Sequence, residues 1–391
     1  SNGTSVSHTY DAGGRLLSIT NTGPLGIISS FQYTYDKAGN RLSVKENTGN
    51  MTQYSYDRIY RLIGYDETRP DAHKGTFEYD SVGNRLKMIL AKKYVSGDSR
   101  SFAYTYNTAN QLLGIIEKGR HSPIETVFNY DPNGNLVTHS ETQGKNTKVT
   151  QYQYDYHNRL NTVVNPDGSN VLIENLNDGF NRLSKTNIIG TTTYFHDGIS
   201  VLAEYDGAGN LAVHYILGPG IDEIIARKDT SGTYFYHYDG MGSVSAITDI
   251  NGKIVARYDY EPFGRFKETT GSTIKNPYLF TGREWDEEIG LYSYRARNND
   301  PKGGRFTTKD PLNIARILLL KQNPSTSASA DQIYNLALRN PQMLNEYVYV
   351  GMKQISDSDG DPYVFRVGRY GDGSLLLLGE VDERVEDADE F

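Results

Sequence analysis

The sequence of 391 residues contains no cysteine, one tryptophan and five methionines. Without cysteine the chain forms neither disulfide bonds nor thiolate metal sites, so packing and hydrogen bonds have to stabilise it. It also lacks any apolar run near the roughly 20 residues that a membrane-spanning helix needs. We therefore predict no membrane span.

Basic residues are outnumbered, since 40 Lys and Arg stand against 48 Asp and Glu, for a formal charge of -8. This balance argues against nucleic acid as the main partner, because phosphate binding requires a concentrated basic surface. The Gly-x-Ser-x-Gly, phosphate-loop and His-Glu-x-x-His patterns are all missing. The eight histidines are scattered, with no pair at helical i, i+4 spacing. We expect no cofactor and no metal site.

Hydrophobic residues make up only 37% of the chain, yet tyrosine is abundant, with 31 Tyr against 13 Phe. Tyrosine combines a large apolar ring with a hydroxyl that needs water or a hydrogen-bond partner. This composition favours a broad sheet with a face in contact with water over a compact aliphatic core.

A tyrosine–aspartate motif recurs through the first two thirds of the chain, at a period in the low to mid twenties. A fixed period of this length indicates a repeat architecture. The clearest copies are Tyr10–Leu16, Tyr35–Leu42, Tyr79–Leu86 and Tyr130–Leu136. Looser copies are Tyr56–Leu62, Tyr106–Leu112, Tyr154–Leu160, Asn177–Leu183 and Tyr205–Leu211.

Each copy has the pattern of a strand, a tight turn and a second strand. Aromatic residues alternate before the Asp, as in Phe31, Tyr33 and Tyr35, which places them on one face of a strand. The Asp is expected to accept backbone N–H groups in the turn, and Gly-Asn tolerates positive φ. Arg-Leu then begins the return strand, with Leu predicted on the buried face.

Stacked hairpins are expected to bring Tyr over Tyr from one repeat to the next, at roughly 0.2–1 kcal/mol for each pair. Such a tyrosine ladder would stabilise a sheet that lacks a thick aliphatic core. The alternative is that the tyrosines form an exposed face that binds sugars.

These motifs resemble the Rhs/YD-repeat family, whose members include toxin-enclosing shells and the extracellular domains of teneurins. From about residue 234 the chain resembles the Rhs-associated core of that family. The segments that carry this second resemblance are Tyr236–Ser245, Tyr258–Gly264, Phe280–Asp286, Gly290–Arg297 and Gly304–Pro311. The resemblance implies an all-β fold, in which antiparallel hairpin repeats coil into a continuous ribbon or shell.

We divide the chain into a YD-repeat ribbon at 1–233, the Rhs-associated core at 234–311, a short helical insertion at 312–344 and a closing part at 345–391. Within the closing part, Tyr363–Val367 and Ser374–Gly379 are predicted to pair as a hairpin. An acidic, solvated tail follows it.

The resemblance also implies possible self-cleavage by two aspartates, one that accepts a proton from water and one that polarises the scissile carbonyl. Asp310 matches the first family motif, although Asn313 replaces a glycine. Asp357 matches the second, with Ser358 in place of a proline. These departures leave two readings open, an active aspartyl autoprotease or two turn residues without activity.

The resulting hypothesis is a structural shell or scaffold that encloses, displays or delivers a C-terminal polypeptide, as in polymorphic toxins. The alternatives are a cell-surface adhesin or filament scaffold that binds glycans or neighbouring cells, and the self-cleaving protein. Expected partners are its own C-terminal segment or cargo, copies of itself and glycans. The chain opens inside a repeat, so we expect a piece of a longer bacterial protein, secreted or at the cell surface, whose export signal lies outside it.

Overall fold

The computed structural model describes residues 2–69, 72–95, 98–178, 181–220, 222–269, 274–310, 345–348, 366–369 and 375–378. Within these residues the chain is nearly all β, with one 24-stranded antiparallel sheet, a four-stranded sheet, a two-stranded sheet and one 3-10 turn, η1 (Phe280–Gly282). The prediction of an all-β fold is confirmed. The predicted helical insertion at 312–344 lies outside the described residues.

The 24-stranded sheet is called the wall. Its first twelve strands are β1 (Ser5–Tyr10), β2 (Leu16–Gly23), β3 (Gly26–Tyr35), β4 (Arg41–Glu46), β5 (Met51–Tyr56), β6 (Leu62–Glu67), β7 (His73–Tyr79), β8 (Arg85–Lys92), β9 (Ser99–Tyr106), β10 (Leu112–Lys118), β11 (Ile124–Tyr130) and β12 (Leu136–Gln143). Its other strands are β13 (Asn146–Tyr154), β14 (Leu160–Val164), β15 (Asn170–Asn175), β16 (Arg182–Asn187), β17 (Gly190–Asp197), β18 (Ser200–Asp206), β19 (Leu211–Leu217), β20 (Ile224–Asp229), β21 (Gly232–Tyr238), β22 (Val244–Thr248), β23 (Ile254–Tyr260) and β24 (Phe266–Glu268).

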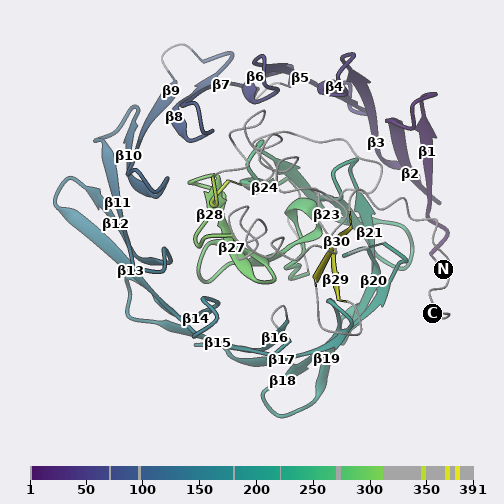
Figure 1. Ribbon diagram of the computed structural model, residues 1–391. Helices are drawn as coiled ribbons and strands as arrows, with labels where there is room; N and C mark the ends of the chain where they lie inside the picture. The colour runs from purple at the N-terminus through teal and green to yellow at the C-terminus, as the bar shows by residue number, and fades with distance from the viewer. Residues whose placement is uncertain are drawn as a thin grey trace.

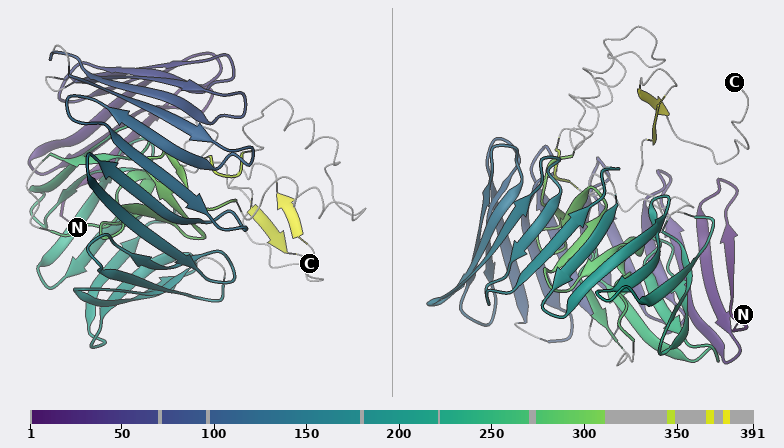
Figure 2. Two further views of the ribbon diagram at one scale, coloured as in Figure 1. Left: turned by 90° about the vertical axis from the view of Figure 1, so that its left-hand side faces the viewer. Right: turned by 90° about the horizontal axis from the view of Figure 1, so that it is seen from below.

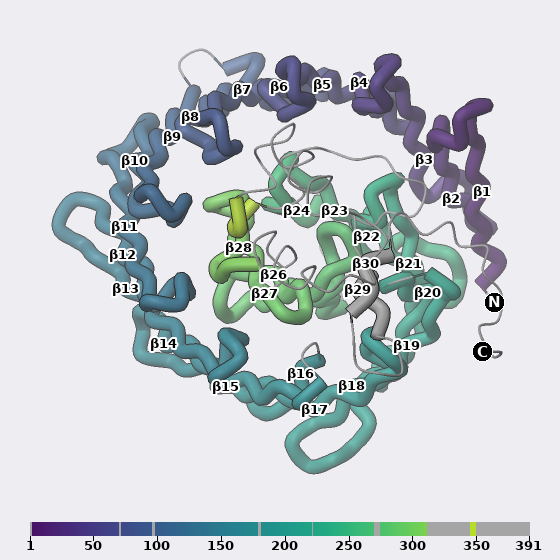
Figure 3. The backbone as a smooth tube through the Cα atoms, viewed as in Figure 1, coloured from purple at the N-terminus to yellow at the C-terminus, as the bar shows by residue number. Residues whose placement is uncertain are grey.

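The wall curls into a ring that overlaps itself (Figure 1). Each strand pairs antiparallel with the next one along the chain, so the sheet is a single ribbon of hairpins. At the overlap, β1–β3 lie outside β21–β23, as the tube in Figure 3 shows. There the Asn21 side-chain amide donates to the Tyr238 carbonyl at 3.1 Å, and Arg257 donates to the Ile28 carbonyl at 2.7 Å. The predicted ribbon therefore closes on itself.

Residues 274–310, the inner segment, lie inside this ring. They form the four-stranded sheet of β25 (Glu284–Asp286), β26 (Leu291–Tyr294), β27 (Arg297–Asp300) and β28 (Arg305–Phe306). Ile289 and Leu291 pack in the same buried cluster as wall residues such as Leu112 and Tyr152. The inside of the ring is thus filled by the protein's own chain.

The tyrosine–aspartate turns follow the predicted chemistry. In the copy at Asp36, the carboxylate accepts the backbone N–H groups of Ala38 and Asn40 at 2.9 and 2.8 Å. Gly39 has φ +83°, a conformation that glycine adopts without strain. The wall strands run obliquely between the two ends of the ring (Figure 2). We call the end at which the turns after Tyr35, Tyr79 and Tyr130 lie the motif rim.

In six copies the tyrosine before the turn connects its repeat to the preceding one through its hydroxyl. Tyr79 donates to the Leu62 carbonyl at 2.8 Å, and Tyr106 donates to the Arg85 carbonyl at 2.9 Å. The same bond recurs for Tyr35, Tyr56, Tyr238 and Tyr260.

Stacking of Tyr on Tyr between successive motif copies is not found among the described residues. Successive motif tyrosines are two strands apart, about 9–10 Å, which is too far for ring contact. Arginine fills part of that gap, as where the Arg61 guanidinium lies 5.2 Å from the ring centre of Tyr79. Hydroxyl bonds and arginine–ring contacts therefore join the repeats.

Tyr79→Phe is expected to lower the free energy of unfolding by about 1 kcal/mol, because it leaves the Leu62 carbonyl without its donor. Tyr10→Phe is the matched control. Tyr10 is the motif tyrosine of the first copy, is 47% exposed and has no hydroxyl partner among the described residues. Chemical denaturation of both variants should show the loss only for Tyr79→Phe, and equal losses would contradict the role of the hydroxyl.

The prediction for the Arg-Leu pairs was wrong in three copies, where the leucine faces outward and the arginine faces the interior. Leu42, Leu86 and Leu183 are exposed, whereas the preceding arginine of each pair is buried. The turn geometry places the fifth residue after the early aspartates on the inner face. That residue is leucine in the short copies, such as Leu62, and arginine in the Gly-Asn-Arg-Leu copies.

The two short strands β29 (Arg366–Arg369) and β30 (Leu375–Leu378) pair antiparallel. This pairing confirms the predicted hairpin between 363 and 379. The acidic tail that follows it lies outside the described residues.

Candidate functional site

Three buried arginines occupy the inward position after a motif turn. Arg41 contacts the turn between β21 and β22 at the overlap of the wall, and the other two contact the inner segment. Arg41 donates to the Gly240 carbonyl at 3.3 Å, and Arg85 donates to the Gly303 carbonyl at 2.7 Å. Arg182 binds the Asp286 carboxylate, as described below. Because Arg85 and Arg182 come from separate repeats, the inner segment is held at two separate places on the wall, and Arg41 holds the overlap.

Arg85 is one of the largest fully buried side chains of the described residues. Its guanidinium lies 4.6 Å from the ring centre of Tyr104 and 4.4 Å from that of Phe263, so aromatic faces flank the cation. A Cβ atom at Gly304 would come within 2.9 Å of an Arg85 nitrogen. The inner segment therefore passes over Arg85 with glycine at the point of closest approach.

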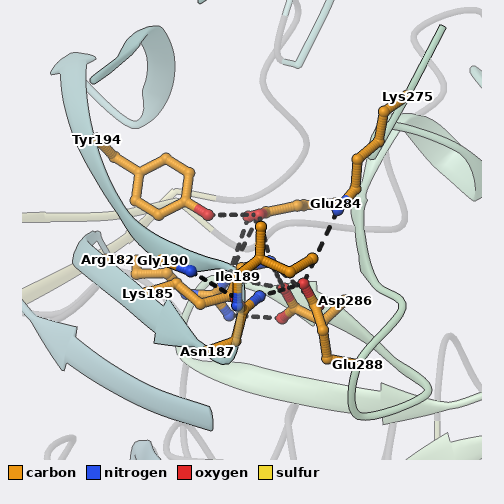
Figure 4. A network of polar contacts seen from close by, with 10 residues as sticks. All are labelled: Arg182, Lys185, Asn187, Ile189, Gly190, Tyr194, Lys275, Glu284, Asp286 and Glu288. Carbon is orange, nitrogen blue, oxygen red and sulfur yellow. Dashed lines mark hydrogen bonds and ion pairs between the residues drawn. The ribbon is translucent and has the colours of Figure 1, made fainter. Parts of the chain in front are cut away.

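The strongest contact between wall and inner segment is an ionic network around Asp286 (Figure 4). The side chain of Asp286 is completely buried, and its two oxygens bind Arg182 Nη2 and Lys185 Nζ at 2.7 Å each. Glu284 accepts a hydrogen bond from Tyr194 at 2.9 Å, and Glu288 lies 3.5 Å from Lys185 Nζ.

The opposite charges of this network keep one another ionised in spite of their burial. Burial alone would raise the pKa of Asp286, but the Arg182 and Lys185 cations overcome it and hold the pKa well below its usual range. The same carboxylate raises the pKa of both cations against the effect of their burial. All three groups are therefore ionised across the physiological range, which suits an anchor and not a proton-transfer site.

Residues 345–348, the strap, cross the motif rim. Tyr347 is fully buried, and its hydroxyl donates to the Gly134 carbonyl at 2.8 Å. Its backbone carbonyl accepts the Phe306 N–H at 3.0 Å. The Asn345 amide donates to the Asn84 side chain at 2.7 Å. The strap thus joins two motif turns of the wall to the last strand of the inner segment.

Of the two aspartates predicted for self-cleavage, the structure describes only Asp310. Its backbone N–H donates to the Glu346 carbonyl at 2.9 Å, and its carboxylate lies 3.2 Å from Arg297 Nη1. Asp310 therefore lies beside the strap, partly exposed. Asp357 lies outside the described residues, so the pairing of the two aspartates stays a prediction.

The three arginines and Asp286 were missed by the sequence analysis. The available signal for the arginines was that Arg takes the place of Leu at the fifth position after Asp36, Asp80 and Asn177. Among the described residues, no three His, Asp or Glu side chains gather into a metal-binding group. No helix in this part of the chain has the length and apolar character needed to cross a bilayer.

Comparison with known proteins places the repeat in a family. The family model described as RHS Repeat matches residues 130–169. The tRNA3(Ser)-specific nuclease WapA of Bacillus spizizenii is 31% identical over 262 residues, which are 66% of this chain and 10% of the relative. The Double-stranded DNA deaminase toxin A of Burkholderia cenocepacia is 25% identical over 297 residues, 72% of this chain and 20% of the relative.

A solved structure, "Crystal Structure of TcdB2-TccC3-Cdc42", covers 92% of this chain at 18% identity, with a TM-score of 0.45, and the match takes up 20% of that chain. The chain spans between 6% and 24% of the length of these curated relatives. The family match falls on the motif at Tyr130 and Tyr154, whose turns and inward tyrosines the structure displays. The chain contains the RHS repeat and is similar to proteins of the WapA and Rhs kind.

Proposed function

We propose that this chain is the closing part of a shell that encloses and delivers a C-terminal polypeptide. The observation that carries the proposal is the inner segment, which the wall surrounds and holds through Arg85 and Arg182. The strap then leads the chain across the motif rim. A closed ring with its own chain inside is suited to retaining a polypeptide and not to turning over a small molecule.

The names of the relatives support the same proposal, because they include a nuclease and two toxins. In this chain the cargo would be the polypeptide that follows the strap, and its identity is not fixed by the wall. We place the protein outside the cell that makes it, as a secreted or surface-displayed shell.

The proposal is tested by protease protection. A recognition sequence for a specific protease is appended after Phe391, and the same sequence is inserted at residues 144–145, an exposed turn of the wall. Enclosure predicts rapid cutting in the turn and slow cutting of the appended site until the protein is unfolded. Equal rates at the two sites would reject enclosure and leave display on a scaffold as the function.

Self-cleavage by Asp310 and Asp357 belongs to this proposal as an additional activity. Asp310→Asn is expected to leave the fold intact and to abolish release of the C-terminal peptide, since it removes the carboxylate but preserves the size of the side chain. Denaturing gels of both proteins over time provide the measurement. Wild-type protein that stays at full mass indefinitely would refute the activity.

The adhesin alternative depended on an exposed tyrosine face. The alternating tyrosines two residues before the motif tyrosines instead lie on the interior side of the wall, as the burial of Tyr104 and Tyr152 shows. Sugar-dependent binding on a glycan array would nevertheless favour adhesion over enclosure.

A further inference from the structure

The place where the ring closes differs in chemistry from the rest of the wall. The outer strands β1–β3 lie face to face with β21–β23, and no backbone ladder joins the two layers among the described residues. We call this contact the seam. The buried apolar clusters on its two sides, one around Ile19 and one around Ile247, are separate from each other.

Polar side chains hold the seam. The Ser29 and Ser245 hydroxyls lie 3.2 Å apart across it. The Asn2 amide donates to the Thr248 hydroxyl at 3.1 Å, and the Thr248 hydroxyl in turn lies 2.9 Å from His237 Nε2. All five side chains are buried. A contact of this kind separates at lower cost than an apolar one, because water replaces its hydrogen bonds.

His237 is the one of these groups that titrates. When neutral, it can accept the Thr248 hydroxyl proton at Nε2, while that hydroxyl oxygen accepts from Asn2. Once protonated, the ring only donates, and the Thr248 hydroxyl proton loses its acceptor. A charged ring would also be trapped in the buried contact between the layers, where the Arg257 cation of β23 acts against its protonation.

We propose that the ring opens in mild acid along this seam, and that protonation of His237 releases the outer strands. The side chains that bond across the seam from Asn2 and from β1–β3 are Asn2, Asn21, Ser29 and Tyr33, and none of them is an anion that would compensate an imidazolium. Arg41 of β4, which contacts the turn after β21, is itself a cation. The inference deepens the proposed shell function by naming how the closed wall is released, and it rests on that function only for its biological purpose.

Burial, and secondarily Arg257, lower the pKa of His237 to about 4 from an ordinary value of 6.5. A group with a lowered histidine pKa stabilises the closed state above pH 6.5, and this contribution is lost as the pH falls toward 4. Between pH 7 and pH 5 the open fraction should therefore rise about 20-fold. Asp239, in the turn after β21, has its pKa raised by burial and acts in the opposite direction.

The absence of cysteine makes the test direct, since a single introduced thiol reports on one position. Ser29→Cys places the thiol in the seam, and Val163→Cys places a control thiol in the buried cluster of the distant wall. Labelling by a disulfide reagent that reacts at pH 5 is normalised to a free thiol peptide at the same pH. We expect the Ser29→Cys rate to rise about 20-fold from pH 7 to pH 5 and the Val163→Cys rate to stay low.

His237→Gln, added to Ser29→Cys, keeps a hydrogen-bonding side chain but removes the titration, and should make labelling independent of pH in this range. An equal rise with Gln, or no rise in the Ser29→Cys protein, would overturn the proposal.

Should the Gln variant fail to fold, a second test uses a cross-link over the seam, Ser29→Cys/Ser245→Cys, together with a probe thiol on β21, Phe235→Cys. Acid-dependent labelling of that probe should vanish when the cross-link is oxidised and return on reduction, and its persistence would refute opening at the seam. A negative result leaves the protease test of enclosure unaffected.

Discussion

Asp286→Asn is expected to lower the free energy of unfolding by about 3–5 kcal/mol, because it leaves Arg182 and Lys185 buried without their shared counter-ion. The cost comes from the abandoned cations and not from the loss of one hydrogen bond. Urea denaturation followed by tryptophan fluorescence measures it. A loss below about 1 kcal/mol would mean that water reaches the network and that the inner segment is not anchored there.

The control for this variant is an exposed ion pair of the wall. Lys87 and Glu78 lie 3.0 Å apart with side chains 46% and 64% exposed, so Glu78→Gln should cost about 0–1 kcal/mol. The acid limb of the stability curve separates the two pairs further. The lowered pKa of Asp286 gives stability that is present above the ordinary value of 3.8 and is lost as the pH falls below it. Asp286→Asn should flatten the wild-type curve in that range.

Arg85→Ala is expected to cost about 3 kcal/mol, because it empties a buried site between Tyr104 and Phe263 and leaves the Gly303 carbonyl without a donor. Arg85 supports the inner segment from a different repeat than Arg182, the partner of Asp286. The losses of stability in Arg85→Ala and Asp286→Asn should therefore add. Chemical denaturation of the single and double variants is the measurement.

Leu86→Ala provides the matched control, one residue further along the same strand. Leu86 is 42% exposed on the outer side of the wall, so its truncation should cost below about 0.5 kcal/mol. Comparable losses at the two positions would contradict the register of β8, since a shift by one residue exchanges the faces.

The repeat unit was accessible from the sequence because its features are local. Asp36 caps its own turn, Gly39 takes the left-handed conformation within it, and alternating aromatics define a face of the strand. Turn and strand chemistry of this kind depends on residues that are neighbours in the chain. The fold class and the hairpin order therefore followed from the pattern.

Two features were not predicted from the sequence: which side chain after each turn faces inward, and the anchor at Asp286. Whether Arg or Leu points inward was decided by the residue count in the turn, and Arg182 finds Asp286 more than a hundred residues later in the chain. Before the copy at Tyr205–Leu211 the chain forms an additional hairpin, β17–β18. This hairpin reverses which face of the wall the fifth residue after the aspartate points to, so that Leu211 is exposed. A repeat pattern alone carries no information on which copy meets which part of the inner segment.

Trp285, the single tryptophan, lies in the inner segment with its ring centre 4.8 Å from that of Tyr292 and 5.5 Å from that of Phe266. Its fluorescence therefore reports on the inner segment, while far-ultraviolet circular dichroism reports on the wall. If the wall encloses and anchors this segment, urea should remove both signals in one coincident transition. A red shift of Trp285 emission at a lower urea concentration, with the β-sheet signal intact, would show a segment that folds apart from the wall and would contradict the account.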